Sequence, residues 1–190
     1  MSSTSSRVFS RRGFILSSGA LTATAACGNG VGSRGSQKID ARVASTVQFM
    51  HQTYPGTIGL TNKAAGMLVM PLITKAGFGL GGSYGRGALQ INDVNVDYYS
   101  AAAGSFGFQI GAQQFAHVLF FMTEDALSDF RRSPGWAAGG DIEYAFKDKG
   151  GNIAADTTTA LDPVIAVIFG QTGLVLGATL EGTKYTRIIP

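Results

Sequence analysis

Alternating glycines between Lys75 and Leu89 constrain the fold of this chain more than any other sequence feature. In a strand, odd and even positions of this segment lie on opposite faces. The odd face is nearly bare: Lys75, Gly77, Gly79, Gly81, Ser83, Gly85 and Gly87. The even face is bulkier: Ala76, Phe78, Leu80, Gly82, Tyr84, Arg86 and Ala88. A bare face lets another backbone approach closely or lets a sheet curl tightly, so we expect a curled sheet whose bulky face lines the core.

Other segments also have strand patterns. Tyr98–Gln113 repeats the alternation of glycine with bulky residues, and Phe115–Met122 is apolar on both faces, as in a central strand. Pro71 interrupts the apolar run Met67–Thr74, which predicts a strand that starts or bends at a sheet edge. The remaining expected strands are Asp141–Phe146, Val164–Phe169, Leu174–Leu180 and Tyr185–Ile189, with turns at Asn92-Asp93 or Asn95, at Lys147–Gly151 and at Gly170–Gly173.

Helical patterns occur in three places. Lys38–Tyr54 carries an apolar stripe and ends at Pro55-Gly56; this amphipathic helix either docks on the core or lies on a membrane surface. A short turn is expected at Thr61–Ala65, with Thr61 or Asn62 as its N-cap, and a later helix is capped by Thr123 and closed by Arg131-Arg132. The sequence therefore predicts a single α+β domain. We expect a curled, mostly antiparallel sheet of six to eight short strands with two or three helices, and a barrel-like closure as an open alternative.

The first 26 residues have the pattern of an export signal. Arg7, Arg11 and Arg12 precede an uncharged run, Gly13–Ala26, that is shorter than the roughly 20 residues of a membrane-spanning helix. The segment Ser10–Leu16 resembles the twin-arginine export motif of bacteria, which serves proteins that are exported already folded. A chance Arg-Arg pair in an ordinary secretory signal is the alternative.

Cys27 is the only cysteine of the chain. The residues before it, Thr24-Ala25-Ala26, resemble the cleavage site of bacterial lipoproteins, in which the cysteine is lipidated, with palmitate among its acyl groups. The predicted organisation is a signal peptide at residues 1–26, a flexible Gly/Ser tether at 27–38 and a folded domain at 39–190. The expected location is the bacterial cell envelope, as a periplasm-facing or surface lipoprotein of the outer membrane. An Ala-x-Ala cut ahead of Cys27 would instead release a soluble protein.

The distribution of charge favours an anionic surface as the partner and excludes nucleic acid. The chain has 15 Lys and Arg and 12 Asp and Glu, and because three of the arginines lie in the leader, the remainder is balanced. Between Cys27 and Asn92, however, six basic residues accompany a single acid, Asp40. The six are Arg34, Lys38, Arg42, Lys63, Lys75 and Arg86. This excess would attract anionic lipid head groups at roughly 1 kcal/mol per side chain, with ordinary solvated lysines as the alternative.

Catalytic and cofactor sites have little support in the sequence. Gly77–Gly82 fits G-x-G-x-x-G, but these glycines alternate within a strand and open no helix, so we expect no nucleotide site. One cysteine and two histidines cannot build a Cys/His zinc cluster. His51 lacks neighbouring ligands, and His117 lies among apolar residues, as a core histidine does. We therefore predict no catalysis, no metal and no cofactor; a pocket joining His117 to a carboxylate would argue otherwise.

Several ordered blocks resemble the SYLF domain family. Lys63-Ala64-Ala65-Gly66, the apolar strand that follows and Lys75-Ala76-Gly77-Phe78 are similar to the opening of that domain. Its later blocks resemble Gly107–Gln113, Val118–Met122, Ala126–Phe130 and Gly173–Gly182. The resemblance covers roughly Ile39–Ile189. Eukaryotic SYLF domains occur in endocytic adaptor proteins and bind phosphoinositides, in some cases also actin, so the resemblance implies a non-catalytic lipid-binding module and points to Lys63 and Lys75.

Together these observations predict an exported lipoprotein that binds anionic phospholipid or phosphoinositide head groups. The expected contact residues are Lys38, Arg42, Lys63, Lys75 and Arg86, and Cys27 carries the anchor. Two alternatives stay open. A carrier of a small apolar ligand predicts an internal pocket lined by Phe78, Leu80, Phe106, Phe108 and Phe120. A structural envelope protein predicts an exposed apolar patch or an oligomer instead. The sequence identifies no protein partner.

Overall fold

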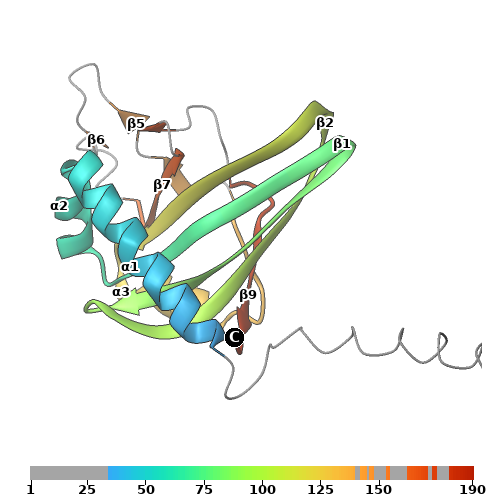
Figure 1. Cartoon of the computed structure of the whole chain (residues 1–190). Helices are drawn as coiled ribbons and strands as arrows, with labels where there is room; N and C mark the ends of the chain where they lie inside the picture. Colours follow the sequence, from blue (N-terminus) through green and yellow to red (C-terminus); the bar gives the residue numbers. More distant parts are fainter. Residues whose placement is uncertain are drawn as a thin grey trace, which may run out of the picture.

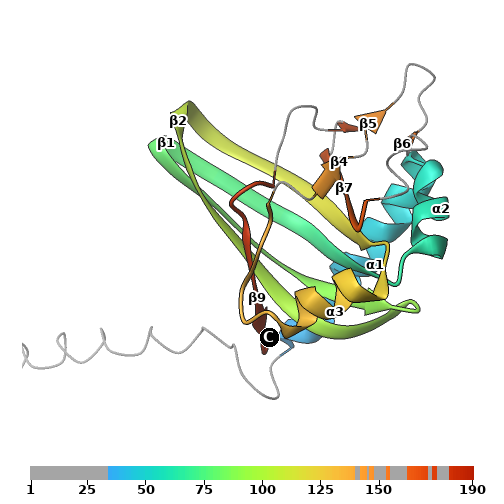
Figure 2. The same cartoon turned by 180° about the vertical axis from the view of Figure 1, so that it is seen from behind.

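The computed structural model describes residues 34–139, 142–144, 146–147, 153–154, 162–170, 173–174 and 180–190. The predictions for the leader and for Cys27 lie outside these residues. Figure 1 shows helix α1 (Gly35–Thr53) across the front of a curled sheet, with the short helix α2 (Gly56–Lys63) at its C-terminal end. Helix α3 (Glu124–Arg132) lies on the opposite side, which faces the viewer in Figure 2. None of the described helices is long and apolar enough to cross a membrane.

Two long strands form the centre of the fold. Strand β1 (Gly66–Ile91) and strand β2 (Val94–Phe121) pair antiparallel from one end to the other. Asn92 and Asp93, with φ of 49° and 62°, form the two-residue turn between them, as in hairpins of type I′. The prediction of short strands is wrong here: the patterns before and after Pro71 belong to one strand, because the register shift between Met70 and Ile73 absorbs the proline.

The bare glycine face is where the β1–β2 ribbon folds back on itself (Figure 1). A Cβ atom on Gly85 would meet the carbonyl oxygen of Leu72, and one on Gly87 would meet that of Val69. Both contacts join residues placed symmetrically about position 78, close to the register shift between Gly77 and Gly79. The two halves of β1 therefore approach backbone to backbone, which only glycine permits at this distance. This confirms the predicted curl and its cause. The prediction that the bulky face lines the core is wrong: this face points outward, with Ala88 under α1 and Tyr84 53% exposed.

The remaining strands extend this ribbon into a seven-stranded sheet in the order β3-β9-β2-β7-β4, with β1 on β2 and β8 on β7. Their bounds are β3 Trp136–Ala137, β4 Ile142–Tyr144, β7 Val164–Gly170, β8 Gly173–Leu174 and β9 Lys184–Ile188, and β5 Phe146–Lys147 pairs separately with β6 Ile153–Ala154. All pairs in the large sheet are antiparallel except β4 with β7. The mostly antiparallel α+β prediction is thus confirmed.

Apolar side chains fill both sides of the sheet. The inner cluster lies within the curl and against α3: Leu68, Met70, Ile73, Leu89, Tyr99, Ala101, Leu119, Phe121, Leu127, Phe130, Ala138, Ile142, Val164, Ala166, Ile168, Leu180 and Tyr185. The outer cluster lies under α1 and α2: Ile39, Val43, Met50, Tyr54, Leu60, Met67, Val69, Ala88, Ala116, Val118, Phe120, Ile165, Val167 and Phe169. Alternate residues of Met67–Met70 and Val118–Phe121 enter the two clusters, so these stretches of β1 and β2 are buried on both faces.

The helices differ from the sequence prediction at one place. Helix α1 docks on the core through Ile39, Val43 and Met50, so its apolar face is used within the fold. Helix α3 is capped as predicted, with the Thr123 hydroxyl oxygen accepting from the Ala126 N–H at 3.2 Å. The turn predicted at Thr61–Ala65 is wrong.

The helix in that region, α2, begins directly after Pro55 and ends at Lys63. Pro55 already has helical φ and ψ at the N-cap. Thr61 caps nothing, because its hydroxyl donates to the Thr57 carbonyl within the helix.

Candidate functional site

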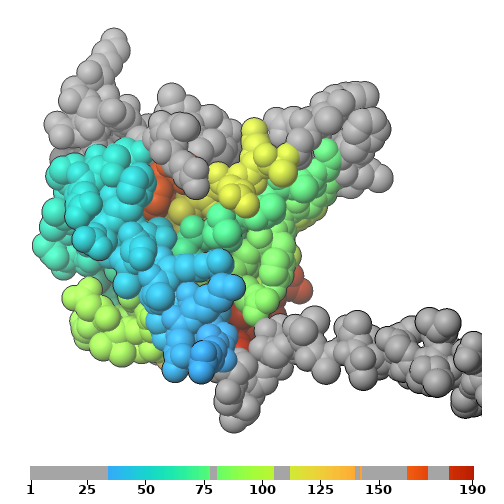
Figure 3. Space-filling model, viewed as in Figure 1, coloured from blue at the N-terminus to red at the C-terminus, as the bar shows by residue number. Residues whose placement is uncertain are grey.

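The exposed side of α1 brings part of the predicted basic set together. Lys38 and Arg42 are one helical turn apart and both exposed. Arg86 on β1 is half-buried and shares its strand face with Ala88, which packs in the outer cluster under α1. These three cations therefore lie on the same side of the sheet, the side that Figure 3 shows with α1 in blue.

Asp40, an acid between Lys38 and Arg42 on α1, is engaged with β2. Its Oδ1 accepts from Asn95 Nδ2 at 2.6 Å and from the Tyr98 hydroxyl at 2.9 Å. Burial raises the pKa of Tyr98, and its hydrogen bond to Asp40 raises it further. The carboxylate therefore ties the start of α1 to the sheet and faces the protein, while Lys38 and Arg42 face solvent.

The structure separates the other two predicted cations from this group. Lys63 ends α2, which packs at the far end of α1 from Lys38. Lys75 shares its strand face with Ile73 of the inner cluster, on the opposite side of β1 from α1. The five residues therefore do not form one patch, because the sheet places positions that are close in sequence on different faces.

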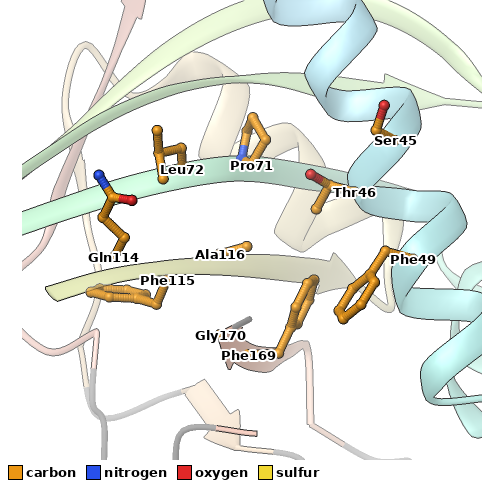
Figure 4. A pocket seen from close by; sticks show the side chains of 10 residues that line it. All are labelled: Ser45, Thr46, Phe49, Pro71, Leu72, Gln114, Phe115, Ala116, Phe169 and Gly170. Atoms are coloured by element: carbon orange, nitrogen blue, oxygen red, sulfur yellow. The ribbon is translucent and has the colours of Figure 1, made fainter. Parts of the chain in front are cut away.

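An apolar groove lies beside α1 (Figure 4). Its volume is about 370 Å³. Residues of α1, β1, β2 and β7 line it: Ser45, Thr46, Phe49, Pro71, Leu72, Gln114, Phe115, Ala116, Phe169 and Gly170. The Phe49 and Phe169 rings form one wall, with centroids 5.9 Å apart. Phe49 is 40% exposed, so the groove opens to the surface. The sequence offered a signal for it, since Arg42, Ser45 and Phe49 recur at helical spacing.

The internal pocket predicted for an apolar ligand is not the groove found here. Phe120, one of its expected lining residues, is fully buried in the outer cluster and does not line the groove. Phe78, Leu80, Phe106 and Phe108 have side chains outside the described residues.

At the C-terminal end of α1, His51 has a structural partner. Its Nε2 lies 2.9 Å from the Thr61 hydroxyl of α2. Burial lowers the pKa of His51, and the charge of Asp93 acts in the opposite direction. The contact joins α1 to α2, so His51 has a structural role at this end of the helix.

His117 is buried in the inner layer of the sheet. Its Nε2 lies 2.8 Å from the Tyr185 hydroxyl, and burial lowers its pKa to about 3. The carboxylate Asp97 lies elsewhere, with Arg187 Nη2 at 2.6 Å and Arg131 Nε at 3.3 Å. Within the described part of the chain, no group of three or more His, Cys, Asp or Glu side chains is arranged to hold a metal ion. His117 has the surroundings of a core histidine, as its sequence context predicted.

Comparison with known families finds a match in the C-terminal part of the chain. Residues 102–187 match the family model described as Ysc84: Las17-binding protein actin regulator. The matched segment runs from β2 through α3 to β9 and so contains much of the sheet and one helix. No curated protein matches the chain.

Proposed function

We propose that this protein is an exported bacterial lipoprotein that binds anionic phospholipid surfaces. The Ysc84 model that matches residues 102–187 represents the SYLF domain family, which the sequence also resembles. The exposed side of α1 supports this proposal: Lys38 and Arg42 face solvent there, and the neighbouring acid, Asp40, is engaged with Asn95 and Tyr98. Positive charge on a protein face attracts anionic head groups and is screened by salt.

The proposed orientation places the N-terminal end of α1 toward the membrane. Lys38 and Arg42 lie only 11 and 15 positions after Cys27, the proposed lipid anchor. A short tether keeps such side chains at high effective concentration near the bilayer, and acyl chains with a basic patch form the two signals that stable membrane attachment requires. Twin-arginine export and an outer-membrane location belong to the same proposal.

The proposed role is non-catalytic. Three polar groups that could serve catalysis have structural partners: Asp40 with Tyr98, Asp97 with Arg187, and Nε2 of His117 with Tyr185. Phosphoinositides, which eukaryotic SYLF domains bind, enter as one class of anionic head group to be compared with phosphatidylglycerol. The Las17 and actin activities in the family's description are not part of this proposal.

Vesicle co-sedimentation tests the proposal. The chain beginning at Gly28 contains every described residue and omits Cys27, so binding cannot come from the anchor. We expect binding to phosphatidylglycerol or phosphoinositide vesicles at low salt, release at high salt, and none to phosphatidylcholine vesicles. The paired change Lys38→Glu and Arg42→Glu should abolish it. Equal binding to neutral vesicles, or none to any vesicle, would contradict the proposal.

A further inference from the structure

The exposed cations and the apolar groove lie along one stripe of α1. Ser45 and Thr46 lie three and four positions after Arg42 and four and three before Phe49, so all four residues occupy one side of the helix. The last three line the groove, and Arg42 is the next exposed residue of this stripe toward the N-terminus, with Lys38 a turn beyond it. The stripe therefore leads from positive charge into an apolar space.

Small side chains and an irregularity in β1 leave this space open. The register of β1 shifts between Met70 and Ile73, and both intervening residues, Pro71 and Leu72, line the groove. Ala116 and Gly170 add little side-chain volume opposite them. The resulting volume of about 370 Å³ falls within the range of small-molecule sites.

The lining favours a hydrocarbon over a peptide. Only Ser45, Thr46 and Gln114 among the ten lining residues are polar. An extended peptide would bury backbone N–H and C=O groups against the ring wall of Phe49 and Phe169, where no partners are offered. An acyl chain has no such groups.

We propose that the groove holds one acyl chain of an anionic lipid, with the lipid head group directed toward Arg42 and Lys38. This inference rests on the proposed function and narrows it, because the protein would take a single lipid chain out of the bilayer plane as well as contact the surface. The Ser45 and Thr46 hydroxyls lie on the α1 side of the groove, toward Arg42, and the Gln114 amide lies across the groove on β2.

Fluorescence titration with cis-parinaric acid, followed by displacement with oleate, tests the site on the chain beginning at Gly28. We expect saturable binding that Thr46→Trp weakens at least tenfold, because the indole fills the groove. Gln48→Trp, an exposed position two residues along the same helix that does not line the groove, is the matched control and should change binding less than twofold. Ser45→Phe is a second groove-filling variant should Thr46→Trp fail to fold.

The head-group contact has its own test. Arg42→Gln should weaken oleate binding about two- to fivefold, as expected for an exposed charge pair, and leave displacement by uncharged monoolein unchanged. Absence of saturable binding in the parent chain, or unchanged binding in both groove-filling variants, would overturn the inference. Co-sedimentation of the same proteins separates the two proposals. Vesicle binding without parinaric acid binding would contradict only the proposal of an acyl chain in the groove. Parinaric acid binding without vesicle binding would contradict only the proposal of binding to anionic surfaces.

Discussion

The two apolar clusters on either side of the sheet differ in how their aromatic rings are arranged and in closure. In the inner cluster the ring of Phe130 packs against those of Tyr99, Phe121 and Trp136. The outer cluster is covered by α1 and α2 and borders an open groove at Phe49. The difference indicates that the inner side secures the fold, whereas the outer side carries the surface available to ligands.

The largest expected contrast compares two phenylalanines. Phe130 is fully buried among rings, so Phe130→Ala should lower the free energy of unfolding by about 3–5 kcal/mol. Phe49 is 40% exposed at the groove, and Phe49→Ala should cost about 1 kcal/mol or less. Urea unfolding measures both. Equal losses would remove the distinction between the two clusters.

The seam between the two halves of β1 should be nearly as sensitive. A Cβ at Gly87 would meet the Val69 carbonyl oxygen, and a backbone atom cannot rotate aside, so Gly87→Ala should cost about 2–3 kcal/mol. Gly104 lies in the paired strand β2 with no atom within 4 Å of such a Cβ, so Gly104→Ala should be neutral or slightly stabilising. Thermal unfolding of the pair tests whether close approach, rather than glycine content, maintains the curl.

The close approach of the two halves of β1 could be predicted, because the alternation of glycines is a local sequence pattern. The lengths of the strands could not be predicted in this way. A proline normally interrupts a ladder, but the shift between Met70 and Ile73 lets β1 continue past Pro71. The Thr123 cap was also predictable, because its hydrogen bond joins residues only three positions apart.

The candidate site was only partly predictable for the same reason. Lys38 and Arg42 lie four positions apart on one predicted helix, so the sequence alone places them on the same side of it. The Asp40–Tyr98 hydrogen bond joins residues 58 positions apart, and Lys75 faces away from α1 because of strand parity. Neither feature can be predicted from the sequence without knowing the strand register of the curled sheet.

Acid should weaken the inner side specifically. The folded pKa of His117 is about 3, below its ordinary value of 6.5, so the unfolded chain takes up the proton first. Its contribution is complete above pH 6.5 and declines as the pH falls toward 3, by about 2 kcal/mol at pH 5. In urea unfolding, His117→Gln should reduce the loss of unfolding free energy between pH 7 and pH 5. Any contribution of His51 is the same in both proteins and cancels in the comparison. An unchanged slope would contradict the assigned burial.

The tie between α1 and the sheet should have a smaller effect on stability. Asp40→Ala leaves the Tyr98 hydroxyl and the Asn95 amide without their acceptor, at a cost of about 1–2 kcal/mol. Asp129→Ala is the control, because the pair of Asp129 with Arg132 is largely exposed and should contribute at most a few tenths of a kcal/mol. Hydrogen exchange of the α1 amides would show whether the loss is local, as this comparison requires.

The smallest effects on stability are expected from changes of surface charge. These changes instead test whether the two faces of the sheet differ in membrane binding. Arg42→Glu, on the exposed side of α1, should weaken binding to phosphatidylglycerol vesicles by about an order of magnitude, since it removes one favourable charge and adds an unfavourable one. Lys75→Glu makes the same change in net charge on the face that β1 turns away from α1, and should weaken binding less than about threefold. If both variants lost binding equally, the protein would respond to net charge alone and the outer face would have no special role. A selective loss with Arg42→Glu would assign membrane contact to that face.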